Sequence, residues 1–258
     1  MVTSGPPVSP STTFVPLEDD IYIASYPRSG TTWLQMILYQ LTTSGEMTFV
    51  HISQVIPFID RCLQLGRDLS TLPRPGVFKT HLPYQQVAKW PGKYIYVARD
   101  GRDVLVSYYY FHQRHPDFKP TFSEFFDRFI RGQVQYGSWF RHVTEWQAHA
   151  NDDSVLYLSY ENLLTNFDEN LRRIAAFCNV PLSPERFEAV KERSSFAFMK
   201  RHARQFDHTT AIVLEMIEQN ARQPFIREGK SGSWKEHFTP EQTRVFDDAV
   251  RGTLAPTD

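Results

Sequence analysis

The chain has 258 residues, of which 41% are hydrophobic and 22% are charged, and its formal net charge is −1. This composition is typical of a globular protein with a sizeable core, and the balanced charge gives no global field that would attract nucleic acid or a membrane surface. No apolar run approaches the length of a membrane span, and the first residues lack the basic and apolar regions of a signal peptide. We therefore expect a cytoplasmic protein without nucleic-acid or membrane partners.

The cysteines Cys62 and Cys178 lie far apart and form neither a disulfide framework nor a metal-ligand spacing, so no metal is expected. Residues 1–16 are rich in Ser, Thr and Pro, which predicts a flexible N-terminal lead-in. No later segment is rich enough in Pro or Gly to separate domains. Residues 17–258 are therefore expected to form a single domain.

Short, almost continuously apolar runs predict β-strands. In chain order they are IYIAS at 21–25, VFKT at 77–80, YIYVA at 94–98 and VLYLS at 155–159. Such runs are typical of parallel strands that are buried on both faces of a sheet. Apolar residues at helical spacing predict helices at 32–41, 103–111, 123–130, 139–148, 166–178 and from 239 onwards. This alternation predicts an α/β fold, a three-layer sandwich around a central parallel sheet.

A glycine-containing turn, SYPRSGTTW at 25–33, follows the first strand and leads into a helix. It matches the phosphate loop of nucleotide-binding proteins at Gly30 and Thr32, but Thr31 stands where that loop has its lysine. Backbone N–H groups at a helix N-terminus still favour an anion, and Arg28 inside the turn could supply the positive charge. Taken alone, the segment also fits a plain strand-to-helix turn. The sequence therefore favours a P-loop-like core in which Arg28, inside the turn, supplies the positive charge in place of the usual lysine.

Chemically active side chains also follow the second and third strands. Lys79 and His81 end the second strand on the same side, and a base beside a cation suits deprotonation of a nucleophile near an anion. Arg99 ends the third strand, where it could grip a phosphate together with the Ser107 hydroxyl. Glycines and cations recur at 227–235, although each segment alone also fits an ordinary charged loop. Ligands bind beyond the carboxyl ends of parallel strands, so we expect these groups to share one site.

Together these segments resemble the cytosolic sulfotransferases that use 3′-phosphoadenosine 5′-phosphosulfate (PAPS). That family carries the motifs YPKSGTTW, KTHLP, YVARxxxDVxVSYYxF and RKGxxGxWK. Here they read YPRSGTTW at 26–33, KTHLP at 79–83, YVARDGRDVLVSYYYF at 96–111 and REGKSGSWK at 227–235. The motifs occur in the family's order, and the resemblance covers nearly the whole chain after the lead-in.

The resemblance implies a role for each matching residue. The 5′-phosphosulfate would lie on a loop made of Arg28, Ser29, Gly30, Thr31 and Thr32. The 3′-phosphate would be held at Arg99, Ser107, Arg227, Glu228 and Gly229. The adenine would lie against Trp33, Tyr160, Ser194, Phe196 and Met199. His81 would be the general base, Lys79 and Arg28 would stabilise charge on the sulfuryl group, and 3′-phosphoadenosine 5′-phosphate (PAP) would be the product.

The resemblance leaves the acceptor less defined. We expect a small molecule with a hydroxyl or an amine, a phenol first and an aliphatic or steroid-like alcohol second. The family places pocket-lining aromatics at Phe58, Tyr84 and Phe111, beside His81. Each aromatic taken singly also fits core packing, which is the expectation for Tyr108.

The sequence departs from the family pattern in the loop and near its C-terminal end. Arg28 replaces a lysine that is credited with protonating the leaving oxygen, and an arginine is a poor acid. Glu228 also replaces a lysine. Of the family's dimer motif KxxxTVxxxE, Lys235 and Thr239 match but Val and Glu are missing, so monomer and dimer both stay open.

Two functions other than an active sulfotransferase are compatible with parts of the sequence. A small-molecule kinase with a P-loop-type site would need a lysine where Thr31 stands. A catalytically silent PAP-binding protein would have no need of Lys79 and His81. The sequence therefore favours the enzyme.

Overall fold

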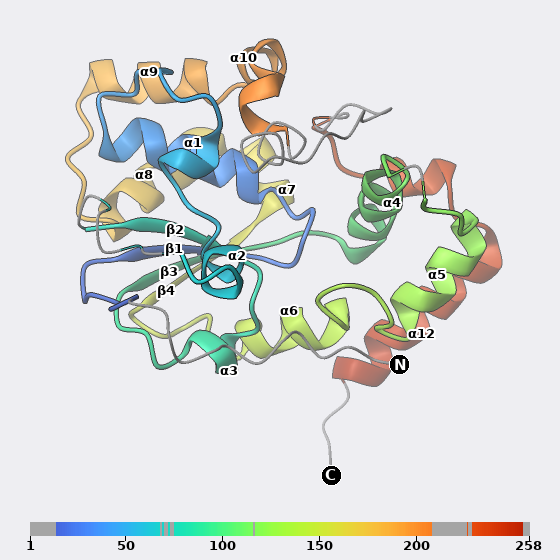
Figure 1. Cartoon of the computed structure of the whole chain (residues 1–258). Helices are drawn as coiled ribbons and strands as arrows, with labels where there is room; N and C mark the ends of the chain where they lie inside the picture. The colour runs from blue at the N-terminus through green and yellow to red at the C-terminus, as the bar shows by residue number, and fades with distance from the viewer. Residues whose placement is uncertain are drawn as a thin grey trace.

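The computed structural model describes residues 14–67, 69, 72, 75–115, 117–207, 226 and 229–254. Its centre is a 4-stranded parallel sheet in the order β2-β1-β3-β4 (Figure 1). The strands are β1 (Ile21–Ala24), β2 (Val77–Thr80), β3 (Lys93–Ala98) and β4 (Val155–Ser159). Every expected strand is present, with bounds that differ by at most one residue. The prediction of an α/β fold with a central parallel sheet is confirmed.

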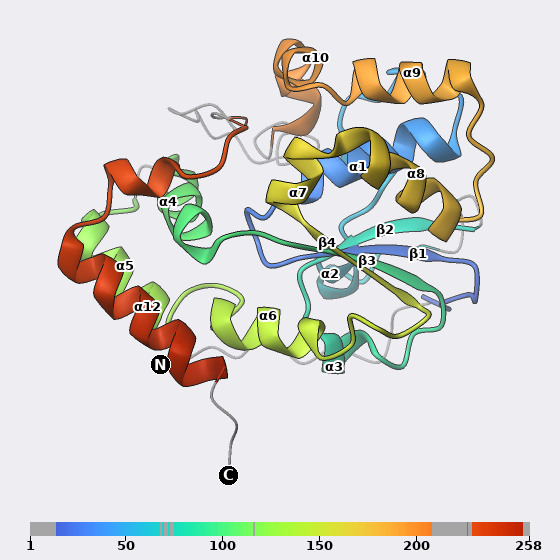
Figure 2. The ribbon, with the colours of Figure 1, turned by 180° about the vertical axis from the view of Figure 1, so that it is seen from behind.

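Helices cover both faces of this sheet (Figures 1 and 2). One face carries α1 (Thr31–Thr42), α7 (Tyr160–Thr165), α8 (Phe167–Phe177), α9 (Pro184–Arg193) and α10 (Phe196–Arg201). The other face carries α3 (Tyr84–Val87) and α6 (Trp139–Gln147), and α2 (Ile59–Gln64) packs against β2. A third group, α4 (Gly101–His112), α5 (Phe122–Ile130) and α12 (Pro240–Leu254), lies beside the sheet, beyond the end of β3. The short 3₁₀ segments are η1 (Ile52–Gln54), η2 (Ala203–Phe206) and η3 (Ser233–Glu236).

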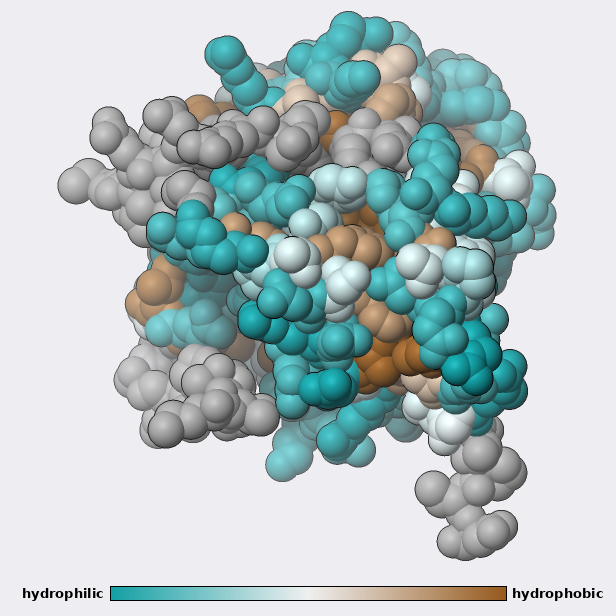
Figure 3. All heavy atoms as spheres, turned by 90° about the vertical axis from the view of Figure 1, so that its right-hand side faces the viewer, coloured by the Kyte–Doolittle hydropathy of each residue, from teal (hydrophilic) through white to brown (hydrophobic). Residues whose placement is uncertain are grey.

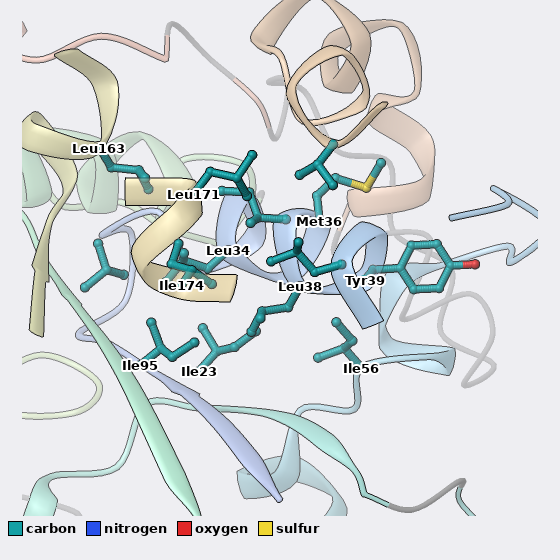
Figure 4. Packing of buried hydrophobic residues seen from close by; sticks show 14 of the residues in the cluster. Ile23, Leu34, Met36, Leu38, Tyr39, Ile56, Ile95, Leu163, Leu171 and Ile174 are labelled. Atoms are coloured by element: carbon teal, nitrogen blue, oxygen red, sulfur yellow. The ribbon is translucent and has the colours of Figure 1, made fainter. Parts of the chain in front are cut away.

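The central strand β1 is buried on both faces because its residues are apolar without interruption. Ile23 packs on the α1 side, where Figure 4 shows it with Ile95 beneath Leu38 of α1 and Ile174 of α8. Tyr22, which points to the opposite side, packs with the second cluster. Each fully buried side chain of this size stabilises the fold by about 1.5–3 kcal/mol. The sheet therefore holds the carboxyl ends of its strands on a rigid base.

The second face of the sheet is covered largely by aromatic rings. Tyr22 stacks on Tyr94 with ring centroids 5.0 Å apart, and Phe78 lies on the other side of Tyr22 at 5.7 Å. Phe14, near the end of the predicted lead-in, packs edge-on against Phe78 at 5.2 Å. Residues 1–13 of that lead-in lie outside the described residues.

The third group of helices holds its own aromatic cluster. Phe125, Phe129 and Phe246 are buried between α4, α5 and α12, so a large share of the phenylalanines serve as core. Thr239 begins α12 as the sequence predicts, because its hydroxyl accepts a hydrogen bond from the N–H of Gln242 at 3.1 Å, and the Gln242 side chain accepts one from Thr239 at 3.0 Å.

The molecular face in Figure 3 is mostly hydrophilic, and apolar atoms show mainly in the gaps between polar side chains. Within the described residues, no helix is both long and apolar enough to cross a bilayer.

Candidate active site

A cavity of about 630 Å³ lies where β1, β2 and β3 end. The segments that follow these strands supply part of its wall: Arg28 comes after β1, His81 after β2 and Arg99 after β3. The volume is within the range of small-molecule and cofactor sites. This is the edge of the sheet at which the sequence predicts a common site.

The turn between β1 and α1 is bent by backbone conformations that few residues adopt. Gly30, the N-cap of α1, has φ 102°, and a Cβ atom at this position would lie 2.7 Å from Cδ2 of Tyr160. Arg28 has φ 70°, which is uncommon for a residue with a side chain. The hydroxyls of Ser25 and Thr31 are hydrogen-bonded at 2.6 Å and close the turn. The turn is therefore tightly specified, as expected for backbone that approaches a ligand closely.

The imidazole of His81 is oriented by a backbone carbonyl. Its Nδ1 lies 2.8 Å from the oxygen of Ser25. A carbonyl only accepts hydrogen bonds, so Nδ1 carries the hydrogen and Nε2 is the basic nitrogen of the neutral ring. Burial, together with the positive charge of Lys79, lowers the pKa of His81 well below its usual value. His81 is therefore a neutral base at physiological pH.

The backbone of His81 is held from both sides. Asp60, on α2, accepts hydrogen bonds from the Thr80 hydroxyl at 2.6 Å and from the N–H of His81 at 2.8 Å. His142, on α6, donates from Nε2 to the carbonyl of His81 at 3.1 Å. The ring of His81 is also flanked by Phe58 and Tyr136, with centroids 5.2 and 5.3 Å away. These contacts leave the imidazole little freedom to rotate.

Lys79, on β2, lies two residues before His81. Its Nζ is 4.6 Å from the ring centroid of Phe58. Burial lowers the pKa of Lys79 to about 8, although the carboxylate of Asp60 acts in the opposite direction. Burial raises the pKa of Asp60 to about 6 against the hydrogen bonds from Thr80 and His81. Lys79 is therefore a cation at neutral pH that loses its charge as the pH rises through about 8.

Arg99 joins the turn to the C-terminal segment. Its Nη1 donates to the carbonyl of Arg28 at 3.0 Å, and its Nη2 donates to the carbonyl of Lys230 at 3.0 Å. The guanidinium lies over the ring of Tyr160, 4.5 Å from the centroid. Its Nε is buried and has no hydrogen-bond partner among the described residues. A buried donor of this kind is available to an anion.

Arg28 makes its own contacts on the opposite side of the turn. Its Nε donates to the hydroxyl of Ser107 at 3.2 Å, and its guanidinium lies 4.9 Å from the ring centroid of Phe111. Both partners are on α4. Arg28 and Arg99 therefore bring two permanent positive charges to the same cavity wall.

The carboxylate of Asp103 fastens the segment after Gly229 to α4. Both oxygens of Asp103 accept hydrogen bonds, from the backbone N–H groups of Gly232 at 2.6 Å and Trp234 at 3.0 Å, and from the hydroxyls of Ser231 at 3.1 Å and Ser233 at 3.3 Å. The cavity wall at Gly229 and Lys230 depends on this anchor.

A flat aromatic region of the cavity wall adjoins Arg99 through Tyr160. Trp33 stacks on Phe167 with centroids 5.8 Å apart and meets Tyr160 edge-on at 5.8 Å. Its Nε1 donates to the carbonyl of Ser194 at 2.9 Å, which fixes the plane of the indole. The ring of Phe196 lies against Gly229, where a Cβ atom would be 2.3 Å from Cδ2 of that ring. Such surfaces accept a planar base.

The structure brings most of the predicted site residues together. The cavity is lined by Arg28, Gly30, Thr31, Thr32, Trp33, Phe58, Lys79, His81, Arg99, Ser107, Phe111, Tyr160, Ser194, Phe196, Met199 and Gly229. Tyr108, expected in the core, is buried and also borders the cavity.

Other predicted residues lie elsewhere. Ser29 is not among the lining residues; its Oγ is buried without a hydrogen-bond partner in the described part of the chain. Tyr84 does not line the cavity, and this corrects the expected pocket, because its ring stacks on His149 with centroids 3.6 Å apart. Arg227 and Glu228 lie outside the described residues.

Several residues of the site belong to none of the sequence motifs. Asp60 supports His81, and Arg61, Gln135 and Tyr136 line the cavity. Tyr136 has φ 70°, a strained conformation that is frequent at functional sites. A lone acidic residue in the apolar stretch IPFID was the only available signal for Asp60. The described residues contain no group of three or more His, Cys, Asp or Glu side chains that could hold a metal.

Comparisons with known proteins agree with this architecture. Residues 18–258 match the model of the sulfotransferase domain family. Sulfotransferase 1A1 of Rattus norvegicus is 34% identical over 265 residues, covering 97% of this chain and 90% of the relative. Sulfotransferase 1 family member D1 of Mus musculus is 35% identical over 249 residues, with 89% and 81% of the two chains covered.

Solved structures give the same result. Mouse sulfotransferase SULT7A1, complexed with PAP, superposes with a TM-score of 0.76 at 29% identity over 96% of this chain and 89% of the other. A retinol dehydratase in complex with androsterone and the inactive cofactor PAP superposes with a TM-score of 0.78 at 26% identity over 94% and 83%. The chain therefore belongs to the sulfotransferase family of enzymes.

Proposed function

We propose that this enzyme transfers a sulfuryl group from PAPS to a hydroxyl of a small-molecule acceptor. The observation that carries this proposal is His81, whose Nδ1 is tied to the Ser25 carbonyl so that Nε2 is the base. The His81 ring lies between the turn after β1, which is proposed to bind the anion, and the part of the cavity lined by the rings of Phe58 and Tyr136, here called the acceptor chamber. A base in that position suits deprotonation of an acceptor beside a bound anion.

The nucleotide would be bound by the groups that converge on the turn. The N–H groups at the start of α1, with Thr31 and Thr32, suit the 5′-phosphosulfate, and Arg99 with Ser107 and Gly229 suits the 3′-phosphate. Trp33 and Phe196 offer surfaces for the adenine. The Nε of Arg99, which is buried and has no hydrogen-bond partner in the described part of the chain, supports an anionic ligand at this place. PAP in the complexes of two solved relatives supports the same choice of nucleotide.

Three residues of the cavity would then promote transfer of the sulfuryl group. PAPS supplies a sulfuryl group attached to a phosphate leaving group. His81 Nε2 takes the proton of the acceptor hydroxyl, a bond forms between the acceptor oxygen and sulfur, and the bond from sulfur to the phosphate oxygen breaks. Lys79 and Arg28 stabilise the negative charge that develops on the sulfuryl and bridging oxygens. Arg28 stays protonated throughout, so its role is electrostatic and it does not supply a proton.

The acceptor chamber suits an aromatic alcohol, and we infer a phenol. Phe58, Tyr108, Phe111 and Tyr136 face the cavity and could pack on a ring placed at His81. Complexes of retinol dehydratase with androsterone and with retinol support a small-molecule acceptor in general.

A screen of PAPS-dependent turnover tests the proposal. Purified protein is incubated with PAPS and panels of phenols, aliphatic alcohols and amines, and PAP release is measured. We expect PAP release with phenols above all. In a parallel assay ATP replaces PAPS and the release of ADP is measured, and we expect none. Turnover of ATP would favour a kinase instead, and tight PAP binding without release for any acceptor would favour a silent binding protein.

A further inference from the structure

One wall of the acceptor chamber is a turn with a strained backbone. The turn runs from Val134 to Gly137, between α5 and α6, and is closed by a hydrogen bond from the Gly137 N–H to the Val134 carbonyl at 3.0 Å. Tyr136, its third residue, has φ 70°, where Gly or Asn is usual. The ring of Tyr136 lines the cavity and meets the ring of His81 edge-on, with centroids 5.3 Å apart. Such strain persists only where the surrounding structure fixes the backbone.

Two buried tyrosine hydroxyls fix the backbone on either side of Tyr136. The hydroxyl of Tyr108 donates to the carbonyl of Gln135 at 3.0 Å, and that of Tyr26 donates to the carbonyl of Gly137 at 2.8 Å. Tyr26 and Tyr108 are 0% and 1% exposed, and their rings meet edge-on with centroids 6.1 Å apart. Both hydrogen bonds therefore start from rings that the core holds in place.

The position of Tyr26 in the chain connects this turn to the base. The carbonyl of Ser25, in the peptide bond to Tyr26, accepts the hydrogen bond from Nδ1 of His81. The backbone at Tyr26 therefore holds the base, while its hydroxyl holds the turn that carries Tyr136. Burial raises the pKa of Tyr26 well above its usual value, so the hydroxyl stays protonated and remains a donor. His81 and Tyr136 belong to separate segments, and Tyr26 sets the spacing between them.

We propose that Tyr26 and Tyr108 are positioning residues for the acceptor: their hydroxyls hold the ring of Tyr136 where an aromatic acceptor can pack on it while the acceptor hydroxyl lies at His81. This proposal rests on the proposed function, since it takes His81 to be the base. The contacts between two rings weaken steeply when the rings separate by a fraction of an ångström, so a turn that is free to shift gives a poorer wall.

Removal of one hydroxyl tests this role. In Tyr26→Phe we expect the Kd of 2-naphthol, a planar phenol, for the protein–PAP complex to rise about fivefold, whereas the Kd of PAP stays within about twofold of the wild type. The KM for 2-naphthol should rise by a similar factor and kcat should change by less than about twofold, because the ring contact is the same before and during transfer. Tyr108→Phe frees the same turn at Gln135 and should give the same pattern. Calorimetry and PAP release measure these quantities.

Tyr94→Phe is the matched control. The hydroxyl of Tyr94 lies 2.7 Å from the carbonyls of Val87 and Trp90, and this residue is buried but does not line the cavity. Urea unfolding should show a loss of stability in the control and in Tyr26→Phe, because each loses a buried hydrogen bond. If Tyr26→Phe and Tyr108→Phe bind 2-naphthol as well as Tyr94→Phe does, the hydroxyls serve stability alone and the proposal is overturned.

A double-mutant cycle assigns the effect to Tyr136. Tyr136→Gly removes the ring and suits a φ of 70°, so the turn is kept. In this background Tyr26→Phe should change the Kd of 2-naphthol by less than about twofold, because no ring is left to position. The same fivefold rise in both backgrounds would show that the hydroxyl does not act through Tyr136, against the proposal. Binding of PAP and 2-naphthol without any transfer would overturn the proposed function alone, since the binding cycle does not depend on turnover.

Discussion

The pKa of Lys79 makes the positive charge beside His81 depend on pH. Burial lowers this pKa from 10.5 to about 8. The protonated form therefore prevails at neutral pH and is lost as the pH rises through about 8. The pKa of His81 is lowered as well, so its neutral, basic form persists at pH values below the usual histidine range.

Transfer should therefore fall on the alkaline side. We expect kcat/KM for PAPS, which reports the free enzyme, to stay level between about pH 6 and 7.5 and to decrease above about pH 8. In Lys79→Arg the side chain stays charged at high pH. The decrease in kcat/KM should therefore begin more than about one pH unit higher than in the wild type. If kcat/KM of the wild type stays level to about pH 9.5, or if it decreases at the same pH in Lys79→Arg, the charge of Lys79 does not stabilise the transfer.

At the scale of elements, the site depends on how the β1–α1 turn packs against α7. Gly30 lies against the ring of Tyr160, the first residue of α7, and its φ of 102° suits a residue without a side chain. The turn can approach both Tyr160 and a ligand only because no Cβ intervenes.

Gly30→Ala should lower the free energy of unfolding by about 1–3 kcal/mol and weaken PAP binding, because backbone strain and the ring contact both displace the turn. Gly66→Ala is the matched control, since Gly66 also has a positive φ, 62°, but no atom lies within 4 Å of the added carbon. Urea unfolding and PAP calorimetry measure both effects. Equal PAP affinities in the two variants would show that the turn does not bind the nucleotide.

The hydrogen bonds by which Asp103 of α4 holds the segment after Gly229 can be tested in the same way. Asp103→Asn keeps the size of the side chain but turns one of its acceptor oxygens into a donor facing other donors. We expect a loss of about 2 kcal/mol in unfolding free energy and about tenfold weaker PAP binding, because Gly229 and Lys230 lose their anchor. Asp248→Asn, on the exposed face of α12, serves as control. Wild-type PAP affinity in Asp103→Asn would exclude this segment from the nucleotide site.

At the scale of the whole molecule, the sequence predicted the parts whose signal is continuous along the chain. Uninterrupted apolar runs located the strands, and apolar residues at helical spacing located most of the longer helices. The ten-residue helix α9 was not predicted, because only Phe187 and Val190 are buried on it and its apolar face is narrow. The short helices α2, α3, α7 and α10 were missed, because each has 4–6 residues and depends on tertiary packing rather than on its own periodicity.

Site residues could be predicted from the sequence where they belong to a motif that directly follows a strand. Cavity-lining residues from other segments could not be predicted. Arg28, His81 and Arg99 converge because parallel strands bring their ends together. Arg61 and Tyr136 could not be assigned, since only the folded chain places α2 and the segment before α6 beside His81. Tyr84 was misplaced because α3 begins at this residue, whose ring then packs on Trp146 of α6 and on His149. The cytoplasmic localisation, the single domain and the open choice between monomer and dimer stay predictions.

The role of His81 is tested most directly by comparing sulfuryl transfer and PAP binding in His81→Asn with those of the wild type. Transfer of the sulfuryl group from PAPS to a phenol is followed by PAP release, and PAP affinity is measured by calorimetry on the same preparations. We expect the variant to bind PAP within about twofold of the wild type while its kcat falls by about 100-fold or more, the contribution typical of a general base. A kcat that stays within about tenfold of the wild type would contradict the assignment of His81 as the base and the location of the active site in this cavity.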